Sequence, residues 1–445
     1  MAAFHQTLED NGRYLTPEAA LLLQKQSDTL LCNGLVFLLH LLVAAMWRLA
    51  AILGYFLWRP ATGDFICPGK ATVDDVWHEE DFTGKRVLVT GGDSGLGFAI
   101  ARAFAARHAQ AGPVQLNLGV VIANHNATAG RLAARNLELT RARSFGTTRD
   151  RNLTRLTGVQ VDSLPLNLGS LQAVREMVEL FYQKYGKTLH YLPPVLAVYS
   201  RKTRALSAIN DAGIVGPSEW TADGFELVFQ VDFLGHFLLT ELLLPALRAG
   251  APARVVMVSS GAHASACVTA GWPEDCFKDF TYLPPPVVPP HEITVNTSHG
   301  PAKRNSSTYG VAKFLNAQHA AALARREAAH GIETCSLSPG FVLTPMTERF
   351  INSSGPTGAK EICREQIHPG PGLPANPCPF TPEEGAAVIA YCATGRIRSG
   401  AYYARSYACE EQLVKEQGFT EQMQEALYEK ALAWVGAAEV SNVIL

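Results

Sequence analysis

The sequence lacks several features that would define a function class at once. Its 38 lysines and arginines nearly balance its 40 aspartates and glutamates, so the net charge is only −2 and no basic surface for nucleic acid is predicted. None of its nine cysteines forms a CxxC pair or clusters with histidine at metal-ligand spacing. We therefore expect free thiols, no disulfide framework and no metal site. No repeat with a period of roughly 20 to 50 residues occurs, which excludes solenoid and propeller folds.

The 445 residues, 47% of them hydrophobic, are enough for a large α/β core with appendages. We predict four parts: an N-terminal segment over 1–59, a linker over 60–84, a catalytic domain over 85–410 and a C-terminal helical extension over 411–445. Within the domain, the arginine-rich residues 138–160 and the proline-containing residues 264–305 are predicted to be insertions.

The longest apolar stretch covers residues 30–58 and is long enough to cross a bilayer. Its aromatic residues, among them Trp47 and Trp58, suit the interface between lipid and water. Arg48 would cost about 3 kcal/mol at the centre of the bilayer. Either residues 30–47 span with Arg48 at the end, or the stretch forms a shallow hairpin in one leaflet. A buried core helix is the alternative that needs no membrane, and a cleaved signal peptide is disfavoured because the run is too long.

The charges beside this stretch are Lys25 before it and Arg59 and Lys70 after it, which weakly favours a cytosolic catalytic domain. We expect a protein of the endoplasmic reticulum membrane or of lipid droplets. Glycosylation sequons keep a luminal catalytic domain open as an alternative. These sequons begin at Asn126, Asn152, Asn296, Asn305 and Asn352.

Residues 86–108 have the order strand, glycine turn and helix. Residues 87–89 are β-branched and aliphatic, as is typical of a strand buried on both faces. The turn holds Gly91, Gly92, Gly95 and Gly97. Glycines let the backbone approach a pyrophosphate closely, and the following helix N-terminus supplies N–H donors. A flexible glycine loop is the alternative, and both the apolar strand before the turn and the helix after it argue against it.

The next predicted strand, residues 119–123, bears on the choice of cofactor. A carboxylate after this strand would bind both ribose hydroxyls and repel a 2′-phosphate, but none is present. NADP is therefore favoured over NAD, with His125, or Arg131 or Arg135 beyond it, facing the phosphate. Asp93 in the glycine turn opposes this interpretation. The alternative is that these basic side chains are only solvated.

Tyr309 and Lys313 form the single Tyr-x-x-x-Lys of the chain. Because residues four apart share a helix face, we expect the ammonium to lower the pKa of the phenol, so that it can exchange a proton near neutral pH. Ser259 or Ser260, after a predicted strand, could hydrogen-bond a carbonyl oxygen as charge develops on it. Alone, such residues are usually a surface pair and a helix cap. Their order after a dinucleotide turn favours hydride transfer with a bound nicotinamide.

Further apolar runs predict the rest of a parallel sheet. They cover residues 161–168, 205–209, 254–258, 334–338 and 401–403. A helix from about Gly224 to Leu247 is apolar on nearly all sides. It should be buried against the sheet or against a partner subunit, which would make a homodimer.

Taken together, these motifs resemble the short-chain dehydrogenase/reductase family. The matching stretches are residues 90–97, 210–213, 258–260, 309–313 and 339–344. The resemblance implies one doubly wound Rossmann-type parallel sheet, here with an N-terminal membrane-anchor helix. It also implies the catalytic residues Ser260, Tyr309, Lys313 and Asp232. The cofactor contacts that it implies are Gly91, Ser94, Gly95, Leu96, Gly97, His125, Asn167, Asn210, Ala212, Gly213, Tyr309, Lys313, Pro339, Gly340, Val342 and Thr344.

Within that family, residues 221–226 and 234–240 are most similar to the retinol-dehydrogenase-like group. That similarity implies a membrane-bound, NADP-preferring enzyme acting on a small lipophilic alcohol or carbonyl of retinoid, steroid or long-chain aldehyde type. Three positions depart from the family pattern. Asp232 and Asp211 replace asparagines, and Asn167 replaces an aspartate near the adenine. They keep a second function open, that of a membrane-bound binding or scaffold protein on a catalytically weakened fold.

Overall fold

A computed structural model represents the chain as two compact units, Met1–Ile66 and Cys67–Leu445, and the described residues all belong to the second. These residues are 73–76, 86–107, 118–144, 159–186, 206–214, 219–270, 292–297, 300–305, 307–348, 380–404, 409–411 and 420–436. The predicted membrane anchor over 30–58 lies outside them.

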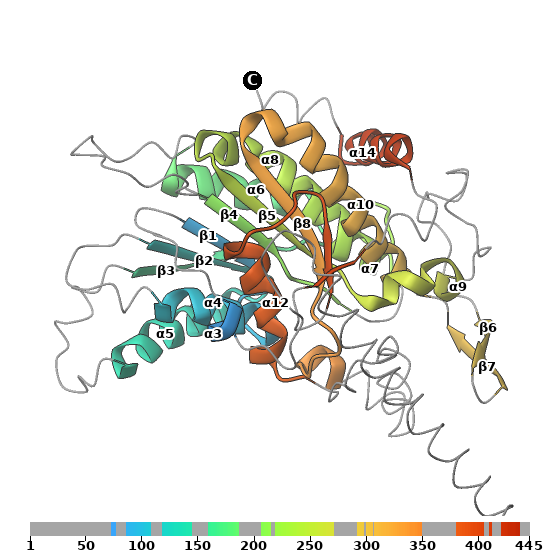
Figure 1. Cartoon of the computed structure of the whole chain (residues 1–445), viewed down its shortest axis with the longest axis horizontal. Coiled ribbons are helices and arrows are strands. Elements are labelled where there is room, and N and C mark those ends of the chain that lie inside the picture. Colours follow the sequence, from blue (N-terminus) through green and yellow to red (C-terminus); the bar gives the residue numbers. More distant parts are fainter. Residues whose placement is uncertain are drawn as a thin grey trace, which may run out of the picture. The chain divides into compact units, whose positions relative to one another are not determined.

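An eight-stranded sheet runs through the second unit in the order β10-β9-β8-β5-β4-β1-β2-β3 (Figure 1). Its strands are β1 (Arg86–Thr90), β2 (Leu118–Asn124), β3 (Val159–Pro165), β4 (Leu206–Asn210), β5 (Ala253–Val258), β8 (Ile332–Ser338), β9 (Tyr402–Ala404) and β10 (Cys409–Glu411). All neighbours pair in parallel except β9 and β10. The chain fills the sheet outward from β1 in one direction and then from β4 in the other. This confirms the predicted doubly wound parallel sheet; the short antiparallel β10 was not predicted.

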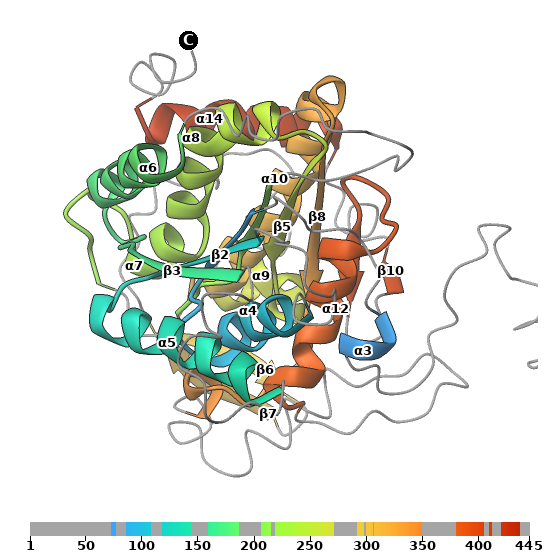
Figure 2. The ribbon, with the colours of Figure 1, turned by 90° about the vertical axis from the view of Figure 1, so that its left-hand side faces the viewer.

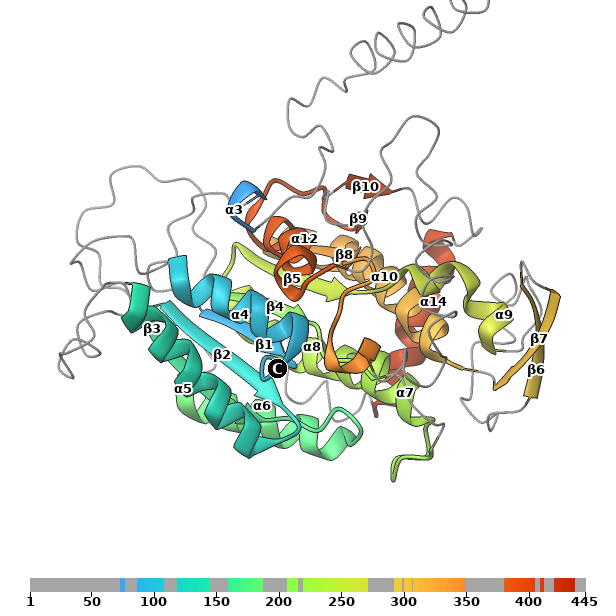
Figure 3. The same ribbon diagram turned by 90° about the horizontal axis from the view of Figure 1, so that it is seen from below.

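Helices cover both faces of the sheet (Figures 1 and 2). One face carries α6 (Leu171–Tyr185), α8 (Gly235–Ala249) and α10 (Tyr309–Glu327). The other carries α3 (Val73–Val76), α4 (Gly95–Arg107), α5 (Ala127–Ser144) and α12 (Pro382–Thr394), seen from below in Figure 3. Successive side chains of a strand point to opposite faces of the sheet, so each face has its own hydrophobic core. In β1, Leu88 packs with the first set of helices, while Val87 and Val89 pack with the second.

The long apolar helix predicted near residues 224–247 is a composite helix over Leu227–Ala249. It consists of α7 (Leu227–Phe229), a π-helical segment (Gln230–Leu234) and α8. Within the described part of the chain, this is the single helix long and apolar enough to cross a membrane, yet 89% of its apolar window is buried inside the protein. It is a core helix, and a second element of the same chain packs against its outer side.

That second element is α14 (Glu421–Trp434), which lies beside α10 in Figure 1 and shares a core cluster with α8. Tyr428 donates its hydroxyl to the buried carboxylate of Glu241 in α8. Arg326 of α10 stacks on the Tyr428 ring, with 3.9 Å from the guanidinium carbon to the ring centroid. The sequence predicted that the apolar helix would be buried against the sheet or against a partner subunit. In the structure, the sheet covers one side of this helix and α14 of the same chain covers the other.

The predicted insertion over 264–305 was expected to be a loop, but the structure forms elements in it. After a 3-10 turn (Gly261–Ser265) that leads into it, these are α9 (Ala266–Ala270) and a hairpin of β6 (Glu292–Thr297) with β7 (Gly300–Asn305). The hairpin was missed because its alternation is short and flanked by prolines. In the other insertion, α5 continues to Ser144 and takes up part of residues 138–160.

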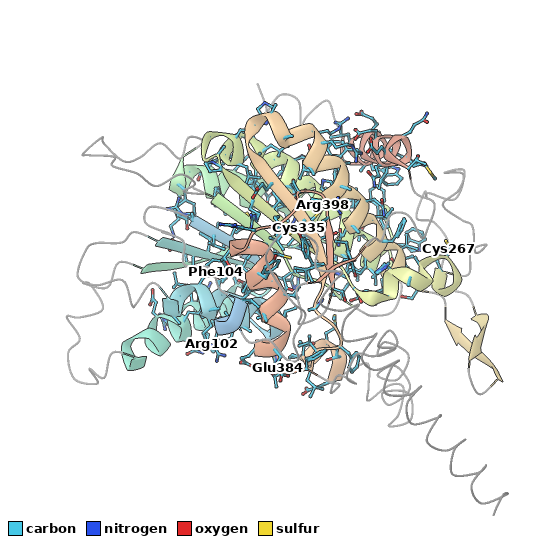
Figure 4. The ribbon with its side chains drawn as sticks, viewed as in Figure 1. Arg102, Phe104, Cys267, Cys335, Glu384 and Arg398 are labelled. Atoms are coloured by element: carbon cyan, nitrogen blue, oxygen red, sulfur yellow. The ribbon has the colours of Figure 1, made fainter. Side chains whose placement is uncertain are left out.

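The cysteines divide into two kinds. Cys335 in β8 and Cys392 in α12 are free and buried, whereas Cys267 in α9 is disulfide-bonded. Figure 4 labels Cys335 and Cys267. The prediction that the chain has only free thiols was therefore wrong for Cys267. Its partner is not among the residues whose side chains are described. The spacing of cysteines in the sequence cannot predict a disulfide between two cysteines that only the fold brings together.

Candidate active site

The predicted site residues gather at one edge of the sheet. They follow the carboxyl ends of β1, β2, β3, β4, β5 and β8. Because these strands are parallel, their carboxyl ends meet at the same edge, and the change of winding direction between β1 and β4 opens a crevice there in folds of this type.

The glycine turn between β1 and α4 is as tight as the sequence predicts. Gly91 and Gly95 adopt φ values of +67° and +54°, which favour glycine. A Cβ at Gly92 would lie 2.5 Å from a methyl carbon of Ile122, and one at Gly97 would lie 2.4 Å from the carbonyl oxygen of Gly91. A side chain would therefore displace the turn, and the backbone with the α4 N-terminus fits a pyrophosphate. Ser94 and Leu96 belong to the same turn and first helical residues.

The end of β2 presents His125 to solvent, as a contact with a 2′-phosphate would require. Asn126 caps α5 by accepting the N–H groups of Thr128 and Ala129, both at 3.0 Å. At the end of β3, the Asn167 side-chain oxygen accepts the N–H of Gly169 at 3.0 Å. This oxygen therefore already stabilises the turn in which Asn167 lies, and one of its lone pairs is used before any contact with an adenine.

The turn after β4 is held by Thr90, a residue that the motif search did not single out. Its hydroxyl accepts the N–H groups of Asp211 at 2.9 Å and Ala212 at 3.0 Å. Its own proton has two acceptors within reach, the carbonyl oxygen of Ile209 at 3.5 Å and the nearer Nε2 of His236 at 3.0 Å. Burial lowers the pKa of His236 to about 3, so the ring stays neutral and can accept. Thr90 and His236 thus fix the turn that carries the predicted Asn210, Ala212 and Gly213.

The two serines after β5 have different surroundings. Ser259 is buried and donates its hydroxyl to the carbonyl oxygen of Lys313 at 2.6 Å, so it ties the strand to α10. Ser260 is partly exposed, accepts the N–H of Ala262 at 3.3 Å and hydrogen-bonds the Tyr309 side chain. Of the two candidates, Ser260 is the one beside the phenol.

Lys313 joins the phenol to a buried carboxylate. Its ammonium nitrogen lies 5.4 Å from the centroid of the Tyr309 ring and 3.2 Å from Oδ2 of Asp232. Asp232 sits in the π-helical segment, where Oδ1 accepts the N–H of Ile214 at 2.8 Å. A Cβ at Gly213 would lie 3.0 Å from the Asp232 carboxylate and 3.1 Å from the Lys313 nitrogen. The predicted catalytic residues therefore converge on one small volume.

The ionisation of this group differs from the prediction in one respect. Burial raises the pKa of Tyr309, and the attraction of Lys313, which lowers it, does not compensate. The expectation of a lowered phenol pKa was thus wrong in sign, because it counted the ammonium and not the lost hydration. Burial would lower the pKa of Lys313, but the Asp232 carboxylate raises it, so the lysine stays charged. Burial likewise raises the pKa of Asp232, with Lys313 opposing.

The segment after β8 approaches the glycine turn from the other side. It contains the predicted contacts Pro339, Gly340, Val342 and Thr344. Gly340 has φ +82°, and a Cβ there would lie 2.8 Å from the Phe380 ring. A Cβ on Gly95 would lie 3.3 Å from the Thr344 methyl carbon, so Thr344 adjoins the start of α4. The predicted nicotinamide contact and the pyrophosphate turn are therefore neighbours.

Sequence comparison finds relatives that are named for related chemistry. No protein-family model matches the chain. WW domain-containing oxidoreductase of Danio rerio is 32% identical over 272 residues, which are 60% of this chain and 52% of that protein. Polyprenol dehydrogenase of Danio rerio is 34% identical over 185 residues, 40% of this chain and 44% of that protein. Retinol dehydrogenase 12 of Mus musculus is 29% identical over 294 residues, which are 66% of this chain and 71% of that protein.

The chain thus spans about half of the WW domain-containing oxidoreductase that it matches. Among solved structures, L-sorbose reductase from Gluconobacter frateurii, complexed with NADPH and L-sorbose, covers 73% of this chain and 97% of its own at 17% identity and a TM-score of 0.45. The three relatives found by sequence are named as an oxidoreductase or as dehydrogenases, which is the enzyme class predicted from the sequence. In sequence, the chain is therefore similar to a WW domain-containing oxidoreductase, a polyprenol dehydrogenase and a retinol dehydrogenase, which agrees with the resemblance that its motifs indicate.

Proposed function

We propose that this protein is an NADP-dependent oxidoreductase that interconverts a small lipophilic alcohol and its carbonyl compound. The observation that carries the proposal is the convergence of Ser260, Tyr309 and Lys313, with Asp232 paired to the lysine. The hydroxyls of Ser260 and Tyr309 and the ammonium of Lys313 can hold or move a proton. The glycine turn that fits a dinucleotide lies at the same edge of the sheet.

Each side chain has a definite part in this reaction. The bound nicotinamide would supply or accept the hydride. Ser260 would donate its hydroxyl to the substrate oxygen and hold it near Tyr309. Tyr309, whose pKa is raised by burial, holds a proton that it can give to that oxygen. Lys313, kept charged by Asp232, would stabilise the phenolate that remains.

NADP is proposed over NAD because the end of β2 offers the exposed His125 and no carboxylate. The names of two relatives, retinol dehydrogenase and polyprenol dehydrogenase, support a lipid-like alcohol as the substrate class. A membrane protein of the endoplasmic reticulum or of lipid droplets, anchored by residues 30–58 with its catalytic domain in the cytosol, suits a substrate that partitions into lipid. We also propose that residues 138–160, as far as they are not helix, and 264–305 are insertions of this domain.

The test is turnover of the full chain in detergent micelles with NADPH or NADH and a panel of a retinoid, a steroid ketone and a long-chain aldehyde. We expect NADPH to be preferred and at least one carbonyl to be reduced. Tyr309→Phe should lower kcat by about 100-fold or more, since general acid catalysis is lost. Tyr391→Phe, a substitution of the same kind in α12 whose hydroxyl donates to a backbone carbonyl, is the matched control and should leave turnover intact.

The rival function would give a different result. A binding or scaffold protein on the same fold would bind NADPH without reducing any member of the panel, and Tyr309→Phe would then behave like Tyr391→Phe in every assay. That pair of outcomes would refute the proposed reaction.

A further inference from the structure

We infer that Glu226 is a positioning residue for Tyr309 and acts through the hydroxyl of Thr308. The inference rests on the proposed function, because it concerns the placement of the proton donor. Glu226 is only 2% exposed, and within the described part of the chain it forms no ion pair. A carboxylate buried in this way is costly unless its oxygens are hydrogen-bonded, so its partners show what it holds.

Glu226 has three hydrogen-bond donors from two elements. Oε1 accepts the N–H of Val228 at 3.1 Å, and Oε2 accepts the N–H of Phe229 at 2.8 Å. These bonds cap the N-terminus of the composite helix over Leu227–Ala249. Oε2 also accepts the hydroxyl proton of Thr308. One carboxylate thus joins the start of that helix to the start of α10.

Thr308 occupies the N-cap position of α10, directly before Tyr309. A threonine there usually accepts an N–H group of its own helix. Here the side chain makes no capping bond and instead donates to Glu226. The first turn of α10 is therefore held from outside the helix, at the residue adjacent to the phenol.

Other contacts join the same helices, and all of them lie after Tyr309, out to the ion pair of Arg248 with Glu327 at 2.7 Å. Lys313 pairs with Asp232 at 3.2 Å, and Asn316 donates to the carbonyl oxygen of Asp232 at 2.9 Å. Among the described contacts between these segments, the bond of Thr308 to Glu226 lies on the N-terminal side of the phenol. Without it, the first turn of α10 can tilt about the contacts that follow it, and the phenol oxygen moves relative to Ser260.

Small displacements of reacting groups are expensive, since about 1 Å can cost 100-fold in rate. We therefore expect Thr308→Val to lower kcat about tenfold while the KM for NADPH stays within about twofold, because the glycine turn is untouched. Thr308→Ser keeps the hydroxyl and should retain near wild-type kcat. Glu226→Gln should lower kcat similarly, and in a Thr308→Val background it should lower it no further.

The experiment measures these four variants in the full chain, with Thr394→Val as the matched control. Thr394 is a buried threonine of α12 whose hydroxyl donates to the carbonyl oxygen of Ala390, so its loss tests an ordinary threonine contact. Hydrogen exchange of the peptide that holds the first turn of α10 is measured in parallel. There the N–H of Ala312 donates to the carbonyl oxygen of Thr308 at 2.9 Å. We expect faster exchange in Thr308→Val and Glu226→Gln and no change in Thr394→Val or Thr308→Ser.

The two readouts separate this inference from the proposed function. If the wild-type chain reduces no substrate, the proposed function fails, while the exchange of the first turn still reports on the contact. Unchanged exchange in Thr308→Val overturns the inference, as does a kcat equal to wild type. Equal losses in Thr308→Val and Thr308→Ser would also overturn it, because the hydroxyl would then be irrelevant.

Discussion

Asp211 offers a sharp test of the electrostatics of the site, because it stands where the family pattern that the sequence resembles has a neutral asparagine. Its carboxylate accepts the N–H of Gly97 at the start of α4 and faces the charge of Lys313. Burial nevertheless raises its pKa from 3.8 to about 7. Asp211→Asn replaces the carboxylate by an amide of nearly the same shape, whose oxygen can still accept from Gly97. The substitution therefore removes mainly the ionisation.

The sign and size of the effect follow from the two pKa values. Below about pH 4 the carboxyl is protonated in both folded and unfolded chains, so its ionisation contributes nothing. Between about pH 4 and pH 7 the unfolded chain ionises and the folded chain does not, so stability falls as the pH rises. The full cost is about 4 kcal/mol above pH 7. Since Asp211 is partly accessible to solvent, water screens part of this cost, and we expect the measured unfolding free energy to fall by about 2 kcal/mol or more.

The assay is urea unfolding of wild type and Asp211→Asn between pH 5 and pH 8, followed by tryptophan fluorescence. Other titrating groups are common to both proteins, so the difference in unfolding free energy isolates position 211. We expect Asp211→Asn to gain stability over wild type as the pH rises, with most of the gain complete by about pH 7.5. Glu383→Gln, which removes an exposed carboxylate paired with Arg102 at 2.6 Å, is the control and should show no such trend. A difference that stays constant with pH, or that grows toward acid pH, would refute the reasoning.

Two further predictions concern buried hydroxyls. Thr90→Val removes the group that joins the N–H groups of Asp211 and Ala212 to His236, so it should cost about 3 kcal/mol or more in chemical unfolding, whereas Thr90→Ser should cost little. Tyr428→Phe removes the hydroxyl donor of the buried Glu241 carboxylate in α8 and should cost about 2 kcal/mol by the same measurement, without altering turnover. A Thr90→Val chain as stable as wild type, or a Tyr428→Phe chain that keeps its stability but loses turnover, would contradict these assignments.

Much of the sheet could be predicted because buried parallel strands are continuous apolar runs. The expected strand over 205–209 is observed over Leu206–Asn210, and the one over 334–338 over Ile332–Ser338. The catalytic pair could also be predicted, since the spacing of Tyr309 and Lys313 on one helix is local. These features depend on neighbours in the chain, which a sequence displays directly.

The features that escaped prediction depend on residues far apart in the chain. The bond between Thr90 and His236 joins positions 146 residues apart, and neither residue type marks such a contact. The disulfide of Cys267 likewise requires a folded loop. The pKa of Tyr309 was predicted with the wrong sign for the same reason, because the sequence shows the nearby ammonium but not the depth of burial around the phenol.

The two aspartates also bear on the direction of the proposed reaction. Lys313 faces three groups that can carry negative charge, namely Asp232, Asp211 and the Tyr309 phenol. Each ionised carboxylate raises the pKa of the phenol, whereas the asparagines of the family pattern would leave it unchanged. A phenol that resists ionisation stays in its protonated form and is present as an acid, whereas it can accept a proton only after it has been deprotonated at a cost. Under the proposed function, this arrangement favours reduction of a carbonyl compound, where Tyr309 is the acid, over oxidation of an alcohol, where it must first become the base.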